Sequence, residues 1–316
     1  MKNKFLRQPN IANGSISFLL ATLLNLVAQS IVGIVIFSLK FSSPELVDTV
    51  NVAGMLVIQI CVSFTLLVNY KQGVKAGNFT AKWQTVLCAV GLGVLSVFGF
   101  AIASGGFDKL LNLLGYNNTA YITLNPFSMV VFLLATVVCA PIVEEMIFRG
   151  YLLNGLKSRL PKPVAVILSA LAFTLIHMSP SQTAYQFCFG LVLGFIASET
   201  NSVLPAIITH SASNLTAFVI AVCNLDLTAL AVGSATGVIV FSLLLLFTVA
   251  VLFFAFKLMK KWENLTAKSE EVAVEKTETE TAGNGEEKRL NTVALCAYIA
   301  GALICAFMWA MVFIAV

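Results

Sequence analysis

Residues 128–153 read SMVVFLLATVVCAPIVEEMIFRGYLL, and this stretch decides the fold class. It exceeds the roughly 20 apolar residues that a helix needs to cross a bilayer at about 1.5 Å per residue. Its formal charges are confined to Glu144, Glu145 and Arg149. The stretch therefore predicts a membrane-spanning helix. Because charged side chains are costly in the bilayer, these three also indicate a functional site.

The whole chain has the same apolar character. Of its 316 residues, 59% are hydrophobic and only 11% are charged, whereas soluble domains carry about 25% charged residues. So few charges cannot cover a water-exposed surface, and the mean hydropathy is +0.92. We therefore predict an all-α, polytopic bundle of about eight or nine transmembrane helices. The expected spans are 16–39, 51–69, 84–104, 128–153, 164–179, 183–198, 202–223, 237–257 and 292–316.

The fifth and sixth expected spans are short. Pro180 and its polar neighbours favour a turn between them, although a re-entrant arrangement is an alternative. The first span follows a basic N-terminus, and its apolar run is longer than the core of a signal peptide, which is about 7–15 residues. We interpret it as an uncleaved transmembrane helix.

The basic residues indicate which way the chain crosses the membrane. If the N-terminus is cytoplasmic and the nine spans alternate, 16 of the 19 Lys and Arg residues fall in inside segments. Cytoplasmic loops are enriched in these residues. We therefore predict a cytoplasmic N-terminus. We also expect a multi-pass protein that is located in the plasma membrane. The inside residues are Lys2, Lys4, Arg7, Lys71, Lys75, Lys82, Lys157, Arg159, Lys162, Lys257, Lys260, Lys261, Lys268, Lys276, Lys288 and Arg289.

Composition also suggests how the chain is organised. A segment with eight Glu and four basic residues, 263–290, is expected to be a solvated cytoplasmic linker, disordered or loosely helical. No basic–aromatic patch or glycine-rich phosphate loop occurs in the sequence, so nucleic acid is not an expected partner. The expected segments are N-terminal transmembrane helices (1–125), a core that holds the intramembrane charges (126–222), an additional transmembrane helix (223–262), the linker (263–290) and a C-terminal transmembrane helix (291–316).

The spacing of the intramembrane charges assigns them different environments. Glu145 and Arg149 stand four residues apart, so they share a helical face and can neutralise each other. Glu144 is rotated from them by about 100°, and a carboxylate in that position is suited to act as a general base. Pro141 predicts a kink nearby that can admit water. The alternative is an ion pair that only joins helices.

The two histidines of the protein, His177 and His210, both fall in apolar spans, at a depth similar to that of Glu144. Phe173 precedes His177 by four residues, and Asn214 follows His210 by four, so each pair shares a face. An imidazole and an amide together can donate hydrogen bonds to an oxyanion. The alternative is that the histidines only pack and that Asn214 only bridges helices.

Other polar side chains in the expected spans include Asn25, Gln29 and Gln59. Asn25 and Gln29 share one helical face. Since amides commonly bond across helices within membranes, we interpret all three as helix contacts rather than as site residues.

Three short motifs occur in order on successive apolar helices: Glu144-Glu145-x-x-x-Arg149, Phe173-x-x-x-His177 and His210-x-x-x-Asn214. Together they resemble the CPBP family of CAAX proteases and bacteriocin-processing enzymes, also called Abi proteins, which includes the type II CAAX prenyl endopeptidases. The resemblance covers about residues 126–222, with Pro141 and Gly150 flanking the first motif.

The resemblance implies peptide-bond hydrolysis inside the membrane. It implies that Glu144 and His177 activate a water molecule, and that His210 and Asn214 stabilise the tetrahedral oxyanion. Phe173 would line the substrate site. The expected partners are membrane lipid and a hydrophobic or lipidated peptide or protein, either CAAX-type or bacteriocin-like.

The resemblance also implies that Glu145 and Arg149 form a supporting ion pair. It leaves the catalytic type open between glutamate protease and metalloprotease. Zinc, if bound, would be held by Glu144, His177 and His210, since catalytic zinc commonly has three protein ligands. The HExxH spacing of zinc proteases is absent, however, so we favour a mechanism that needs no cofactor.

Two other functions fit the same residues. A non-catalytic immunity or scaffold protein could keep this fold and act by binding. A proton-coupled transporter could use the buried carboxylates and histidines as a relay, although the sequence shows no inverted repeat of the kind many transporters have.

Overall fold

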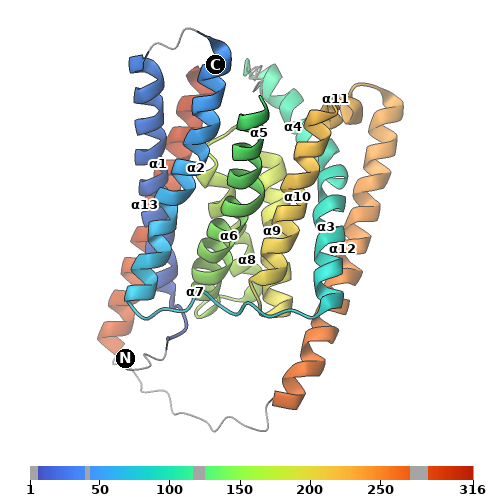
Figure 1. Cartoon of the computed structure of the whole chain (residues 1–316). Coiled ribbons are helices and arrows are strands. Elements are labelled where there is room, and N and C mark those ends of the chain that lie inside the picture. The colour runs from blue at the N-terminus through green and yellow to red at the C-terminus, as the bar shows by residue number, and fades with distance from the viewer. Residues whose placement is uncertain (1–5, 40–42, 117–124, 271–283, 316) are drawn as a thin grey trace.

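The computed structural model describes residues 6–39, 43–116, 125–270 and 284–315, and within them the chain is a polytopic bundle of helices (Figure 1). The helices are α1 (Ile11–Leu39), α2 (Pro44–Lys71), α3 (Trp83–Gly99), α4 (Ala101–Leu113), α5 (Pro126–Leu133), η1 (Leu134–Cys139), α6 (Ala140–Glu145), η2 (Met146–Leu153), α7 (Asn154–Lys157), α8 (Lys162–Ile176), α9 (Thr183–Thr200), α10 (Leu204–Val222), α11 (Leu227–Val232), α12 (Ala235–Glu270) and α13 (Asn284–Ala315).

Seven stretches of helix in the described residues are long and apolar enough to cross a membrane. Each contains or largely overlaps one of the expected spans. Their outer faces carry large exposed apolar side chains such as Phe37, Leu113 and Ile314, which lipid would cover. The chain is therefore an integral, multi-pass membrane protein. The membrane-length stretches are Ile11–Leu39, Pro44–Lys71, Trp83–Leu113, Pro126–Lys157, Leu204–Val222, Ala235–Glu263 and Asn291–Ile314.

The fifth and sixth expected spans correspond to α8 and α9, which are not among those seven. The fifth span was expected to reach residue 179, but α8 ends at Ile176. The physical reason is local: Met178 has a positive φ of 49°, and the residue before Pro180 disfavours helix. The turn predicted between these two helices is present. It places His177 at a helix end rather than within a helix.

Successive crossings of the bundle alternate in direction, with α4 continuing the direction of α3 and the run from α5 to α7 forming one crossing (Figure 1). The first helix begins, α12 ends and α13 begins at the lower end of the view. That end also holds the start of α3 and the turn between α7 and α8, where Lys82, Lys157 and Lys162 lie. Which compartment the lower end faces stays a prediction.

Part of the expected linker is helical, because α12 continues to Glu270 and α13 begins at Asn284. These ends include residues that were expected to be disordered or loosely helical. Residues 271–283, the rest of that prediction, lie outside the described part of the chain.

The run from α5 to α7 is the central element of the bundle and contacts α1, α2, α8, α9 and α10. Side chains of η2, such as Ile147, Phe148 and Leu152, are fully buried. Glycines let the backbone of neighbouring segments approach the run from α5 to α7 closely. A Cβ on Gly150 would lie 2.5 Å from the Ala76 carbonyl oxygen. Small residues at such contacts are typical of helix packing in membranes.

Residues 72–82, which we call the strap, cross the lower end of the bundle between α2 and α3 (Figure 1). The strap pairs with the N-terminal segment, where the Arg7 amide donates to the Gly73 carbonyl at 2.8 Å. Its Asn78 carbonyl accepts the Val203 amide at 2.8 Å. Backbone hydrogen bonds therefore fasten the strap beneath Gly150 and the start of α10.

Candidate active site

An ion pair lies at the centre of the bundle, on the face that the spacing predicted. Arg149 Nη1 donates to Glu145 Oε1 at 2.8 Å, and both side chains are fully buried. The second guanidinium nitrogen, Nη2, donates to the Gly190 carbonyl on α9 at 3.0 Å. The Arg149 guanidinium also lies over the Phe173 ring, 4.4 Å from its centroid. The contact expected between Glu145 and Arg149 is present. The other two contacts of Arg149, with Phe173 and Gly190, tie η2 to α8 and α9.

His210 joins this pair, a contact that the sequence did not reveal. Its Nδ1 lies 2.9 Å from Glu145 Oε1 and the ring is buried. Because Arg149 is always charged, Glu145 is its carboxylate partner and can only accept hydrogen bonds. The proton must then sit on His210 Nδ1. Glu145 thus orients an imidazole in the way that a carboxylate does in hydrolytic triads.

His177 is oriented by the end of its own helix. Its backbone amide bonds to the Thr174 carbonyl at 3.3 Å, which leaves the Phe173 carbonyl without the usual amide of the next turn. The imidazole takes that place, with Nδ1 at 2.7 Å from the Phe173 oxygen. A carbonyl cannot donate, so Nδ1 carries the proton and the neutral ring keeps a lone pair on Nε2.

The ring of Phe173 brings the two histidines together. It meets His177 edge-on at a centroid distance of 4.9 Å and His210 at 5.7 Å. Phe189 closes the other side of His210, at 5.6 Å. Motif residues from three separate helices therefore gather around one aromatic ring.

Glu144 faces a different environment from Glu145, as its rotation about the helix predicted. Its Oε1 accepts a hydrogen bond from Gln59 Nε2 of α2 at 3.0 Å. Its Oε2 is buried and has no hydrogen-bond partner among the described residues. The carboxyl group is thus held at one oxygen and left available at the other. Gln59 had been interpreted only as a helix contact, so its place beside Glu144 was missed.

Asn214 bonds across helices rather than to His210. Its Nδ2 donates to the Thr136 carbonyl at 2.7 Å. That carbonyl lies in the π-helical turn η1, where Ala140 N bonds to the oxygen five residues earlier, on Ala135. With the same spacing of five residues, the amide of residue 141 would donate to the Thr136 carbonyl, but Pro141 has no N–H. The Asn214 side chain therefore donates to the Thr136 carbonyl in place of the amide that Pro141 lacks. Around Pro141, where a kink is predicted, the structure has π-helical turns on both sides of α6.

This arrangement predicts that Pro141 and Asn214 are energetically coupled. Asn214→Ala should destabilise the fold by about 1 kcal/mol, the scale of hydrogen bonds between membrane helices. The same change should cost less in a Pro141→Ala background, because an alanine amide can serve the Thr136 carbonyl. Unfolding free energies of the two single variants and the double variant form the test. Strictly additive effects would show that Pro141 and Asn214 do not share an acceptor.

The alternative zinc site has no assembled ligand set. Within the described residues, no group of three His, Cys, Asp or Glu side chains is close enough to hold a metal ion. This includes the proposed ligands Glu144, His177 and His210.

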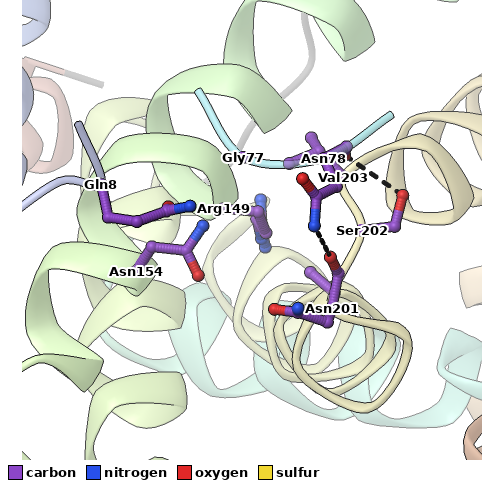
Figure 2. Close-up of a pocket in the computed structure, with 9 residues that line it drawn as sticks. Gln8, Gly77, Asn78, Arg149, Asn154, Asn201, Ser202 and Val203 are labelled. Carbon is purple, nitrogen blue, oxygen red and sulfur yellow. Dashed lines mark hydrogen bonds between the residues drawn. The ribbon is translucent and has the colours of Figure 1, made fainter. Parts of the chain in front are cut away.

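A polar pocket of about 200 Å³ reaches Arg149 from the lower end of the bundle (Figure 2). Amide side chains from the strap, η2–α7 and the α9–α10 turn gather around it, and Asn78 Nδ2 donates to the Asn201 carbonyl across it at 3.3 Å. The Nε of Arg149 is buried without a partner among the described residues. The pocket is lined by Gln8, Gly77, Asn78, Arg149, Asn154, Ala197, Asn201, Ser202 and Val203.

Comparison with protein families gives a match to the Rce1-like type II CAAX prenyl endopeptidases over residues 126–216. Comparison with curated proteins and with solved structures gives none. The matched residues begin at the start of α5 and end within α10, so they contain all three motifs. With membrane-length helices on either side of this segment, the chain is a multi-pass membrane protein whose residues 126–216 resemble the Rce1-like type II CAAX prenyl endopeptidases, and this resemblance supports a protease.

Proposed function

We propose that the protein hydrolyses a peptide bond of a membrane-associated substrate with a water molecule activated by Glu144 and His177. One observation supports the proposal: Glu144 Oε2 is buried with no hydrogen-bond partner among the described residues, and the Nδ1 contact of His177 leaves Nε2 unprotonated in the neutral ring. A water molecule between them would find two acceptors. One can hold it while the other removes its proton.

The reaction would proceed through a tetrahedral intermediate. Glu144 takes a proton from water as the oxygen attacks the scissile carbonyl carbon, and the carbonyl oxygen becomes an oxyanion. The same proton then passes from Glu144 to the leaving amine when the C–N bond breaks. The carboxylate is thereby regenerated, and the products are a new acid and a new amine. Phe173, which packs against both imidazoles, would form one wall of the substrate site.

His210 and Asn214 are the proposed oxyanion donors. With Nδ1 bonded to Glu145, His210 can donate from Nε2 only as an imidazolium. The Asn214 amide has a second N–H beyond the one given to Thr136. Donors placed where negative charge develops are often the largest contribution to catalysis.

The family match supports a class of substrate. We propose a hydrophobic or lipidated peptide, and the probe to use is a farnesylated CAAX-type peptide with a fluorophore and quencher on either side of the scissile bond. Purified protein in lipid nanodiscs should cleave it. Cleavage should persist after dialysis against a metal chelator, because the proposed reaction needs no metal ion. A peptide that is bound but never cleaved would favour a non-catalytic binding protein instead.

A further inference from the structure

Gln59 is a polar side chain outside the matched family segment that touches the proposed machinery. It lies on α2, and its Nε2 donates to Glu144 Oε1 at 3.0 Å. Its own oxygen, Oε1, is buried and has no partner among the described residues. The described structure thus directs this amide toward one acceptor, the carboxylate that we propose activates water.

The surrounding contacts hold Gln59 in place. Toward one end of α2, Asn125 Nδ2 donates to Thr49 Oγ1 at 3.0 Å, which fastens α2 to the start of α5. Toward the other end, Asn69 Nδ2 donates to Ser17 Oγ at 2.9 Å, which fastens α2 to α1. Gln59 lies about ten residues from each fastening, roughly 15 Å along the helix. The donor is therefore carried by an anchored helix rather than by a mobile loop.

We propose that Gln59 is a positioning residue for hydrolysis: its amide holds Glu144 Oε1 so that Oε2 faces the water to be activated. This inference rests on the proposed function of Glu144. A carboxyl group on a Glu side chain rotates freely unless a partner orients it. Fixing one oxygen selects the orientation in which the other can reach the substrate. The active site would then extend beyond residues 126–216 to include α2.

The competing interpretation is that Gln59 only joins α2 to α6. A residue with that role would affect the stability of the fold and would leave the rate of the chemical step unchanged. The two interpretations therefore differ in kcat. A positioning residue that acts on the transition state lowers kcat and kcat/KM together.

The experiment compares three Gln59 variants with the control Gln84→Leu and with Glu144→Gln, all on the farnesylated peptide in nanodiscs. Gln59→Leu removes the donor at similar volume and should lower kcat about 10- to 100-fold with KM nearly unchanged, because a small misplacement of a reacting group has that scale of effect. Gln59→Glu keeps the shape but replaces the donor with a second carboxyl group, and it should lose at least as much. Gln59→His restores an N–H near the same position and should recover part of the rate.

The matched control is Gln84→Leu. Gln84 is a half-buried glutamine on α3 whose oxygen also has no partner among the described residues, and it has no described contact with Glu144. The control should keep the wild-type kcat. Melting temperatures of all variants in detergent separate lost packing from lost chemistry.

The outcomes distinguish the inference from the function on which it rests. A low kcat for Gln59→Leu with partial rescue by Gln59→His supports the inference. If Glu144→Gln is inactive while Gln59→Leu matches Gln84→Leu, the inference is wrong and the proposed function stands. If Glu144→Gln cleaves as well as the wild type does, the proposed function fails and the role of Gln59 fails with it.

Discussion

A Glu144→Gln variant is expected to lose about 10²- to 10⁴-fold in the rate of peptide cleavage, the range that general acid–base catalysis contributes. The glutamine keeps the volume of the side chain and can still accept from Gln59 through its oxygen. It cannot take a proton from water. The fold should therefore survive, because Glu144 is not part of the buried ion pair.

The measurement for Glu144→Gln is kcat on the farnesylated peptide, together with the melting temperature in detergent. The matched control is Glu199→Gln. Glu199 is a mostly buried carboxylate on α9 that pairs with Lys162 and, at 3.6 Å, with Lys260. It lies at the lower end of the bundle, so its loss should leave cleavage intact. A well-folded Glu144→Gln protein with wild-type kcat would exclude Glu144 as the base.

The second large effect is expected on stability. Arg149→Met should destabilise the fold by about 3–5 kcal/mol, because it leaves the Glu145 charge buried without its cation. It also removes the hydrogen bond to Gly190 and the stacking on Phe173. Unfolding in mixed micelles measures this cost. By contrast, Lys162→Met breaks a partly exposed pair with Glu199 and should cost no more than about 1 kcal/mol.

A double variant separates the two roles of the ion pair. Replacing both partners, as Glu145→Met and Arg149→Met, removes both buried charges and should recover much of the lost stability. Cleavage should stay low, because His210 has then lost the carboxylate on its Nδ1. If the double variant were both stable and fully active, Glu145 would have no part in orienting His210.

Several features of the site could be predicted because they are local to one helix. The Glu145–Arg149 contact depends only on a spacing of four residues, and the different environment of Glu144 depends only on the rotation per residue. The departure from regular α-helix near Pro141 follows from a missing amide hydrogen. Membrane spans follow from length and apolarity, which seven of the helical stretches satisfy.

Contacts between helices could not be predicted in the same way. Helical spacing placed Asn214 on the same face as His210, yet its side-chain amide donates to the Thr136 carbonyl on η1. His210 in turn is held by Glu145, a partner 65 residues away in the chain. The end of α8 before His177 depended on a positive φ at Met178, a residue type with no particular preference for that conformation.

By itself, the sequence determined that this chain spans a membrane and which ionisable groups lie within the spans. Both could be predicted because the cost of burying a charge depends on residue type, and residue type is given by the sequence. Only the tertiary structure decided which polar groups are hydrogen-bonded to one another. Gln59 was one amide among several, and packing of α2 against α6 made it the partner of Glu144. Hydrogen bonds act over about 3 Å, so their pairing is set by how helices pack and not by where residues stand along the chain.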